Sequence, residues 1–578
     1  MIFFYIFMFM SRNNTLEMGI KRIMLPAEEV DFTTVKYERE VIKEPEPGVI
    51  LMEEDSAPTS RVEIALKCLP PYNPATSWNA DSSPFLYWKI RDFAHAYRSN
   101  LVTPLMVAEY IISAVEEFNN KKPPMQLLIS FSAEDVRNQA AASTERFKEG
   151  EPLSILDGIF MPIKDDVDCY PHPTMGATTW FDKVRPVKRD AVCVSKLRSC
   201  GVILIGKANM HELGVGTTGN NPNYGTPRNP HDLERYTGGS SSGPAAIVAA
   251  GLCPAAIGTD GGGSIRIPSS LCGIVGLKTT YGRTDMTGNH FSLVVLFCRS
   301  LCHPGIVEII GPIAATVEDV MLVYAAISCS SPSDRYSLKP ASPCLPNLSS
   351  CNSLNDVGSL CLGKYTEWFN DVYSTEISDR CEDVLNMLST THGCKTIEVV
   401  IPELHEMRTA HTVAYGSGEM CTLFPDYQAG NAAQLTHDTR TNLAFFRSFS
   451  ASDYVASGRL RRRIMYFHME IFKKVDIIVT PTTGMTAPII PVESLQFGET
   501  NLEVSAYLMR FIIAANLLGL PAISVPIGHD KQGLPIGLQL IGRPWAEATI
   551  LRLASAIEEL CAESRKRPST FYDVLKVK

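Results

Sequence analysis

The segment Tyr236–Arg283 constrains the fold more than any other part of the chain, because glycine, serine and small apolar residues fill most of it. Two clusters stand out within it, GGSSSG at 238–243 and GGGS at 261–264. The residues between them, 244–258, include no charged side chain. Such a run predicts buried elements and places both serine clusters on loops at their ends, where reactive groups are often positioned by a rigid scaffold.

The uncharged run divides into a helix and a strand. Pro244 suits the first helical position, because its φ angle fits and its missing N–H is not needed there. Ala245–Ala250 is predicted to form a helix of small residues that Gly251 closes. Ala255–Thr259 is predicted to be a buried strand whose end delivers the chain into the GGGS cluster.

Three glycines before a serine have a specific physical use. Without Cβ atoms, Gly261, Gly262 and Gly263 can turn sharply and direct their N–H groups at one point. The Ser264 hydroxyl would face that same point, where an oxyanion on an attacked carbonyl would form. The alternative is a flexible glycine turn with an incidental serine. Two serine clusters around one buried unit argue against that alternative.

The motifs of this segment resemble the signature of the amidase signature family of serine hydrolases. The resemblance rests on GGSS at 238–241 and on GTDGGGSIRIPSSLCGIVGLK at 258–278. It extends from about Trp88 to Pro568 and is densest between Ile155 and Arg283. The usual form of the first motif is GGSSGG. Ser242 and Pro244 alter its end and leave Ser240 and Ser241 intact.

The resemblance implies a catalytic set of Lys164, Ser240 and Ser264, without histidine or aspartate. Ser264 would be the nucleophile, and the N–H groups of Gly261, Gly262, Gly263 and Ser264 would form the oxyanion hole. Ser240 would relay the proton to Lys164.

Lys164 can act as a base only when it is neutral, so burial would have to lower its pKa from about 10.4 towards 7. Asp165, Asp166 and Asp168 would oppose this if they faced the amine, and we expect them to point elsewhere. The alternative reading of Lys164 is a structural ion pair with one of them. Asp260 and Arg266 flank the nucleophile and are expected to pair.

Composition excludes several classes of protein. The chain has 578 residues, of which 45% are hydrophobic and 20% charged, and this indicates a globular protein with one large or two fused domains. The net charge of −9 gives no reason to expect nucleic acid as a partner. Sixteen cysteines without paired spacing indicate a reducing compartment. No CxxC or HExxH motif occurs, so no metal or other cofactor is expected.

The chain is predicted to contain an N-terminal variable segment, 1–85, and an amidase signature domain, 86–575, with its signature core at 155–283. The apolar start, 1–10, is interpreted as an incorrect start or as a membrane-touching tail. The segment 289–304 is either an insertion or an artefact.

Helices are predicted at 88–98, from Thr103-Pro104 onward and at 208–216. Strands are predicted at 155–164, 201–207, 475–479, 522–525 and 536–541. His211 is a further candidate base, although a histidine in such a segment is commonly structural.

Alternating strands and helices predict an α/β fold. The family resemblance implies a large mixed twisted sheet covered by helices on both faces. Within the family, TGGSSSGPAAIVAAG and KTTYGRTDMTG most resemble the plant members that hydrolyse fatty acid amides. The expected activity is hydrolysis of amides such as N-acylethanolamines.

The alternatives are a small-amide amidase, an amidotransferase subunit and a catalytically dead scaffold. The resemblance further implies a lipid amide substrate, a homodimer, contact with a membrane surface and an intracellular site at the endoplasmic reticulum or plasma membrane.

Overall fold

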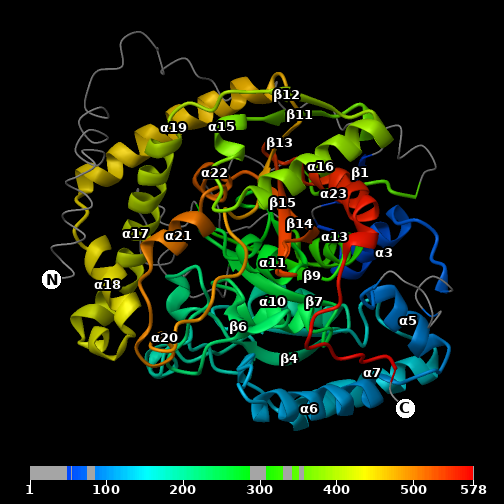
Figure 1. Cartoon of the computed structure of the whole chain (residues 1–578). Helices are drawn as coiled ribbons and strands as arrows, with labels where there is room; N and C mark the ends of the chain where they lie inside the picture. The colour runs from blue at the N-terminus through cyan, green and yellow to red at the C-terminus, as the bar shows by residue number, and fades with distance from the viewer. Residues whose placement is uncertain are drawn as a thin grey trace.

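The computed structural model describes residues 49–53, 55–74, 78, 85–286, 307–329, 342–349 and 357–576 (Figure 1). The predictions for 1–10 and 289–304 lie outside these residues. None of the described helices is both long enough and apolar enough to cross a membrane.

An eleven-stranded mixed sheet runs through the described molecule, in the order β12-β11-β13-β15-β14-β8-β9-β7-β3-β4-β2. Its pairs are parallel at β12/β11, β11/β13, β7/β3 and β3/β4, and antiparallel elsewhere. The strands are β2 (Leu128–Ser130), β3 (Phe160–Lys164), β4 (Ile203–Ala208), β7 (Ala255–Asp260), β8 (Val275–Lys278), β9 (Ile309–Ala314), β11 (Cys361–Lys364), β12 (Lys395–Glu398), β13 (Ile477–Pro481), β14 (Ala522–His529) and β15 (Pro535–Gly542). Two small two-stranded sheets join β1 (Val49–Leu51) to β10 (Cys344–Pro346) and β5 (Arg228–Asn229) to β6 (Asp232–Tyr236).

Helices surround this sheet (Figure 1). They are α3 (Pro58–Cys68), α5 (Ile90–Arg98), α6 (Pro104–Asn120), α7 (Ala133–Glu149), α8 (Phe181–Val184), α9 (Val192–Ser199), α10 (Ser242–Ala249), α11 (Arg266–Cys272), α13 (Val317–Ile327), α15 (Thr366–Phe369), α16 (Thr375–His392), α17 (Leu404–Gln428), α18 (His437–Phe446), α19 (Ala451–Phe472), α20 (Ser494–Phe497), α21 (Leu502–Leu508), α22 (Ile513–Leu518) and α23 (Glu547–Leu560). Short 3₁₀ helices occur at η2 (Glu212–Gly214), η5 (Asn431–Gln434) and η6 (Ala562–Ser564).

Helices cover both faces of the sheet, as predicted. A Cβ atom added to Gly537 of β15 would meet Ser270 of α11, whereas one added to Gly542 of the same strand would meet Ile550 of α23. Side chains in a strand alternate between the two faces, so positions 537 and 542 point to opposite sides. Helices α11 and α23 therefore lie on opposite faces.

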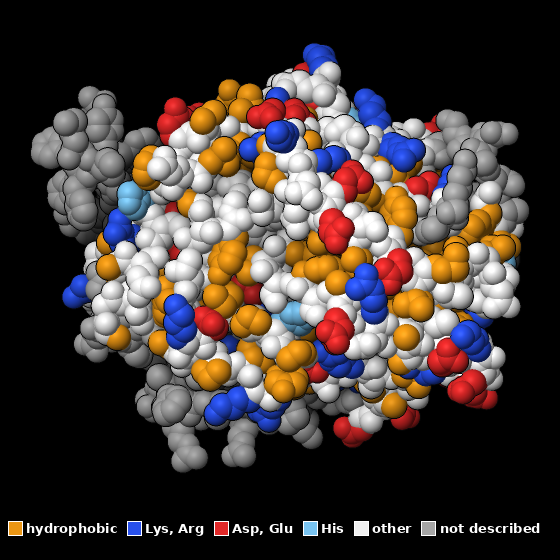
Figure 2. Space-filling view, turned by 90° about the horizontal axis from the view of Figure 1, so that it is seen from below, with side chains coloured by type: hydrophobic (Ala, Val, Ile, Leu, Met, Phe, Trp, Pro, Cys, Tyr) orange, Lys and Arg blue, Asp and Glu red, His pale blue; other side chains and the backbone are white. Residues whose placement is uncertain are grey.

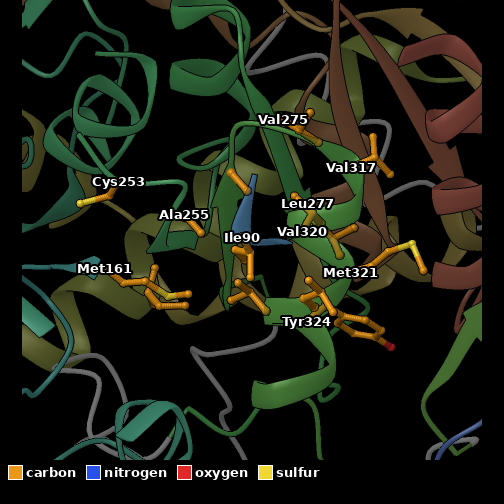
Figure 3. Packing of buried hydrophobic residues seen from close by; sticks show 14 of the residues in the cluster. Ile90, Met161, Cys253, Ala255, Val275, Leu277, Val317, Val320, Met321 and Tyr324 are labelled. Carbon is orange, nitrogen blue, oxygen red and sulfur yellow. The ribbon is translucent and has the colours of Figure 1, made fainter. Parts of the chain in front are cut away.

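Helix α13 lies within the core, and each of its residues except Glu318 is buried. Val317, Val320, Met321 and Tyr324 are buried and recur at the spacing that places them on one helix face. They belong to the same cluster as Val275 and Leu277 of β8 (Figure 3). Helix α3, within the predicted N-terminal variable segment, also packs against α13.

Most predicted elements form with ends shifted by a few residues, and the two largest differences are at β3 and at 208–216. Strand β3 begins at Phe160 instead of Ile155, because residues 153–158 form turns. The predicted helix at 208–216 is wrong except for η2. The backbone there is drawn into other contacts, since the Asn209 carbonyl accepts from Gly243 N and Leu213 takes a positive φ of 52°.

Candidate active site

Two neighbouring parallel strands bring a lysine and a threonine together. Residue Ile163 of β3 is in register with Ile257 of β7, so the carboxyl ends of both strands meet at one edge of the sheet. Lys164 ends β3, and Thr259 lies near the end of β7. The Lys164 Nζ atom donates to Thr259 Oγ1 at 2.6 Å and to Ser240 Oγ at 2.8 Å. All three side chains are buried.

Ser240 lies on the loop that enters α10. The backbone fixes it from both sides: its carbonyl accepts from His211 N at 3.1 Å and from Ser242 N at 2.9 Å. The peptide bond from Gly239 to Ser240 is cis. This loop also contacts residues 261–264, which carry the predicted nucleophile and are called the nucleophile loop below, because Ser241 N donates to the Ser264 carbonyl at 3.1 Å.

Ser264 follows the glycine turn at the end of β7. Gly263 has φ +97°, and a Cβ atom there would lie 2.5 Å from Ile512 Cγ2, so only glycine fits without strain. The Ser264 side chain remains 8% exposed, and its hydroxyl has no hydrogen-bond partner among the described residues. Ser264 is thus the more accessible of the two predicted catalytic serines, since Ser240 is 1% exposed.

A buried ion pair braces the nucleophile loop, as expected from the sequence. Asp260 Oδ2 lies 2.9 Å from Arg266 Nε, and both side chains are fully buried. Asp260 Oδ1 also accepts from Gly263 N at 2.8 Å and from Asn516 Nδ2 at 2.8 Å. Burial by itself raises the pKa of Asp260, but the charge and hydrogen bonds of Arg266 lower it overall.

The Gly263 N–H is therefore already committed to the Asp260 carboxylate. Of the four backbone donors predicted for the oxyanion hole, those of Gly261, Gly262 and Ser264 have no partner among the described residues. These three donors are the ones still able to stabilise charge on a bound substrate.

The expectation that all three aspartates point away from Lys164 is wrong for one of them. Asp165 pairs with Lys207 at 3.3 Å, and Asp168 pairs with Arg185 at 2.9 Å. Asp166 instead places Oδ2 3.0 Å from Lys164 Nζ. The strand ends at Lys164 and the chain turns, with Val167 N donating to the Lys164 carbonyl, so strand alternation does not govern the next side chains.

The histidine candidate does not reach the site. His211 Nε2 lies 2.9 Å from Asp438 Oδ2, and both side chains are buried. A different histidine, His411 of α17, contacts the nucleophile loop, with Nε2 3.0 Å from the Gly261 carbonyl. Burial lowers the pKa of His411 to about 4, so it is neutral near pH 7.

Sequence reasoning missed two buried glutamates near Lys164. Glu308 immediately precedes β9, and its carbon atoms lie beside Gly261. Glu419 lies on α17 and is 3% exposed. Buried glutamates are uncommon, but exposure cannot be read from the local sequence of either residue. No group of His, Cys, Asp and Glu side chains suited to a metal ion occurs among the described residues.

The Amidase family profile matches residues 109–551, and the chain belongs to the amidase signature family. Among its relatives is the fatty acid amide hydrolase of Oryza sativa subsp. japonica, 64% identical over 92% of this chain and 86% of the relative. The fatty acid amide hydrolase of Medicago truncatula is 58% identical over 96% of this chain and 100% of the relative. A bacterial aryl acylamidase shares the fold, with a TM-score of 0.70 and 23% identity over 86% of this chain and 100% of its own.

Proposed function

We propose that this protein is a fatty acid amide hydrolase that cleaves N-acylethanolamines and related long-chain amides through Lys164, Ser240 and Ser264. The observation that carries the proposal is the buried contact of Lys164 Nζ with Ser240 Oγ, on a loop whose Ser241 N donates to the Ser264 carbonyl. The identity to plant fatty acid amide hydrolases supports the substrate class.

The chemistry follows from these positions. Ser264 Oγ attacks the amide carbon, while its proton passes to Ser240 and the Ser240 proton passes to Lys164 Nζ. The N–H groups of Gly261, Gly262 and Ser264 stabilise the oxyanion. The same chain then returns a proton to the leaving nitrogen, and water hydrolyses the acyl-enzyme.

Asp166 adds one condition to this mechanism. An ionised carboxylate 3.0 Å from Nζ stabilises the ammonium form, which cannot accept a proton. For Lys164 to act as a base, its amine must first lose a proton, either to Asp166 or out of the site.

Apolar side chains beside the nucleophile loop support an acyl chain as the ligand. A Cβ atom on Gly262 would lie 3.3 Å from Met509 Cε, and one on Gly263 would meet Ile512. Met509 also packs against a buried cluster that includes Leu508 and Ile267. Each buried CH₂ group contributes about 0.8 kcal/mol, so a longer acyl chain should bind the transition state better.

We infer that the segment leading to Met509 contacts a phospholipid surface. Four large apolar side chains in it are more than half exposed, at 63%, 77%, 51% and 52% for Ile489, Val492, Phe497 and Leu502. Figure 2 shows hydrophobic side chains in several groups on the face seen from below, with charged side chains spread among them. A lipid-facing segment next to the acyl-chain site would give apolar substrates a short path. Homodimer formation stays a prediction.

Two measurements test the proposed function. Ser264→Ala should abolish covalent labelling by a fluorophosphonate probe, whereas Ser269→Ala, a control on α11, should keep it.

The wild-type kcat/KM should be higher for long-chain N-acylethanolamines than for short aliphatic amides. Met509→Gln, which retains most of the side-chain volume, should lower the ratio of kcat/KM for long-chain amides to kcat/KM for short amides. Full labelling of Ser264→Ala would overturn the nucleophile, and a preference for short amides would overturn the substrate class.

A further inference from the structure

The peptide group between Gly261 and Gly262 is held at its carbonyl end by a side chain of α17. His411 Nε2 lies 3.0 Å from the Gly261 carbonyl oxygen, and the histidine is buried. A carbonyl oxygen can only accept a hydrogen bond, so Nε2 carries the proton and donates it. The peptide bond is trans, and the C=O and N–H of a trans peptide group point in opposite directions. The Gly262 N–H therefore points away from His411.

The other free donors of the nucleophile loop belong to peptide groups that are held in the same way. The carbonyl of the residue before Gly261 accepts from Asn516 Nδ2 at 3.1 Å, and the carbonyl of the residue before Ser264 accepts from Ile267 N at 2.8 Å. Each of the three N–H groups that have no partner among the described residues thus shares a peptide group with a carbonyl that is already bonded. This pattern directs the three donors away from their anchors.

The His411 ring is itself fixed by its neighbours. It stacks on Tyr415, one helical turn later on α17, with ring centroids 5.9 Å apart and ring planes 9° from parallel. The Tyr415 hydroxyl donates to the Gly214 carbonyl at 3.3 Å. A Cβ atom on Gly261 would lie 3.3 Å from Tyr415 Cε2, and one on Gly262 would lie 3.4 Å from His411 Cε1. The two rings therefore lie directly beside both glycines.

An anchor matters at this peptide group because glycines flank it, and without Cβ atoms they offer little resistance to its rotation. We propose that His411 is a positioning residue that fixes this peptide group, so that the Gly262 N–H faces the oxyanion formed when Ser264 attacks an amide. The inference rests on the proposed function, in which Ser264 is the nucleophile. In this proposal His411 does not touch the substrate and transfers no proton. It acts only through the direction of the backbone.

His411 is a better test of this idea than the other side-chain anchor. Asn516 also donates to the Asp260 carboxylate at 2.8 Å, so its replacement would disturb the buried pair of Asp260 with Arg266. His411→Phe, in contrast, keeps an aromatic ring next to Tyr415 and removes the donor. His411→Gln can place an amide N–H near the position of Nε2.

Steady-state kinetics on the amide that the wild type hydrolyses best measures the effect. The kcat of His411→Phe should fall at least about tenfold, because loss of one oxyanion donor costs about 10²–10³ in kcat and a misdirected donor costs part of that. The KM should change by less than about threefold, since the interaction is made in the transition state. His411→Gln should recover most of the lost kcat. Glutamine cannot act as a base, so this recovery would exclude proton transfer by His411.

An inhibitor provides a readout that a merely structural role would not move. A trifluoromethyl ketone adds the serine hydroxyl and then carries an oxyanion, as the transition state does. Its Ki should rise at least about tenfold in His411→Phe while the KM for the amide stays nearly constant. End-point labelling with a fluorophosphonate counts the active sites, so that kcat refers to folded enzyme only.

The matched control is His468→Phe. His468 of α19 is also a fully buried histidine, and its Nδ1 lies 2.9 Å from the Ile464 carbonyl of the same helix. The same substitution at this position changes the packing of a buried ring without touching the nucleophile loop. The control should keep the wild-type kcat per active site and the wild-type Ki, whatever its melting temperature. If His411→Phe does not fold, His411→Asn replaces it, because its shorter amide does not reach the Gly261 carbonyl.

The outcomes separate this inference from the proposed function. If Ser264→Ala is still fully labelled, or if the wild type does not hydrolyse long-chain amides, the proposed function is wrong. If Ser264→Ala is unlabelled while His411→Phe keeps the wild-type kcat and Ki, the role of His411 alone is overturned. Equal losses of kcat in His411→Phe and His468→Phe would overturn it as well, and so would a His411→Gln enzyme as slow as His411→Phe.

Discussion

At the residue scale, the function of the site depends on which groups surround a single amine. Lys164 Nζ has Ser240 Oγ, Thr259 Oγ1 and Asp166 Oδ2 within 3.0 Å. Two of these contacts are hydroxyls, and the third is a carboxylate. The proposed catalytic base therefore also forms a buried ion pair, and substitution can distinguish the two roles.

Lys164→Arg provides that distinction. Guanidinium does not give up its proton near neutral pH, so turnover should fall by at least about a hundredfold, as it should in Lys164→Ala. Steady-state kinetics measures the loss, and the melting temperature reports folding. In the control Lys89→Arg, the ion pair with Glu318 lies outside the site, and activity should persist. A well-folded, active Lys164→Arg enzyme would make Lys164 structural.

Asp260 links the nucleophile loop to stability at low pH. Its pKa is lowered in the folded state, so the ionised carboxylate stabilises the fold above the unfolded pKa of about 3.9, and this contribution is lost as the pH falls below that value. Asp260→Asn leaves Arg266 buried without its counterion and should cost about 3–5 kcal/mol in the free energy of unfolding.

Urea denaturation at pH 7 and pH 3 measures both effects. The stability of Asp260→Asn should change less between these pH values than that of the wild type, and exposed Asp379→Asn should behave like the wild type. Equal pH dependence in all three proteins would remove Asp260 as a source of acid sensitivity.

At the scale of elements, the β7–α11 connection is the most demanding part of the fold. The turn must hold Gly263 at φ +97° while Ile512 and Ile267 occupy the space that a Cβ atom would need. A helix C-cap such as Gly150, after α7, has a similar φ of +81° but no atom within 4 Å of a Cβ position. Both glycines adopt a positive φ, but a Cβ atom would clash with neighbouring atoms only at Gly263.

Comparing Gly263→Ala with Gly150→Ala isolates the steric requirement. Each should lose about 1 kcal/mol of stability from the left-handed conformation. Gly263→Ala should lose about 1–3 kcal/mol more through overpacking and should show a reduced kcat, because the loop shift moves Ser264. Urea denaturation measures both losses. Equal losses of stability would show that Ile512 and Ile267 can move away from the added methyl group at no cost in free energy.

At the scale of the whole molecule, one sheet and its covering helices collect the candidate site from distant parts of the chain. Strands β3 and β7 supply Lys164 and Thr259, helix α17 supplies His411 and Glu419, and the segment before α22 supplies Met509. That last segment also carries the exposed Val492 and Phe497. Substrate access and lipid contact are thus proposed for one continuous stretch of chain.

Vesicle sedimentation tests this arrangement in the intact protein. The double variant Val492→Asp/Phe497→Asp should bind phosphatidylcholine vesicles at least about tenfold more weakly, because each side chain contributes about 1.5–3 kcal/mol when buried in lipid. The control Val184→Asp/Val400→Asp changes two side chains that are also more than half exposed. If both double variants bind vesicles as the wild type does, the proposed lipid contact is wrong.

The local sequence was sufficient to predict the scaffold of the site. Small residues and glycines left few alternatives between 238 and 264, so strand β7 and the Asp260–Arg266 pair formed where they were predicted. Helix α10 also formed, but it begins at Ser242, two residues before the predicted first helical residue, Pro244. The helix predicted at 208–216 failed because Asn209 bonds to distant backbone groups, which outweighs local helix propensity.

The charge environment of Lys164 was decided only by the tertiary structure. Three aspartates follow it closely in sequence, but the turn after β3 directs Asp166 alone to the amine. Glu308, His411 and Glu419 lie more than 140 positions from Lys164 in the sequence, and no local motif marks them. Local sequence specifies backbone conformations, because those depend on neighbouring residues. Burial and electrostatic interactions depend on which distant side chains the sheet and helices bring together.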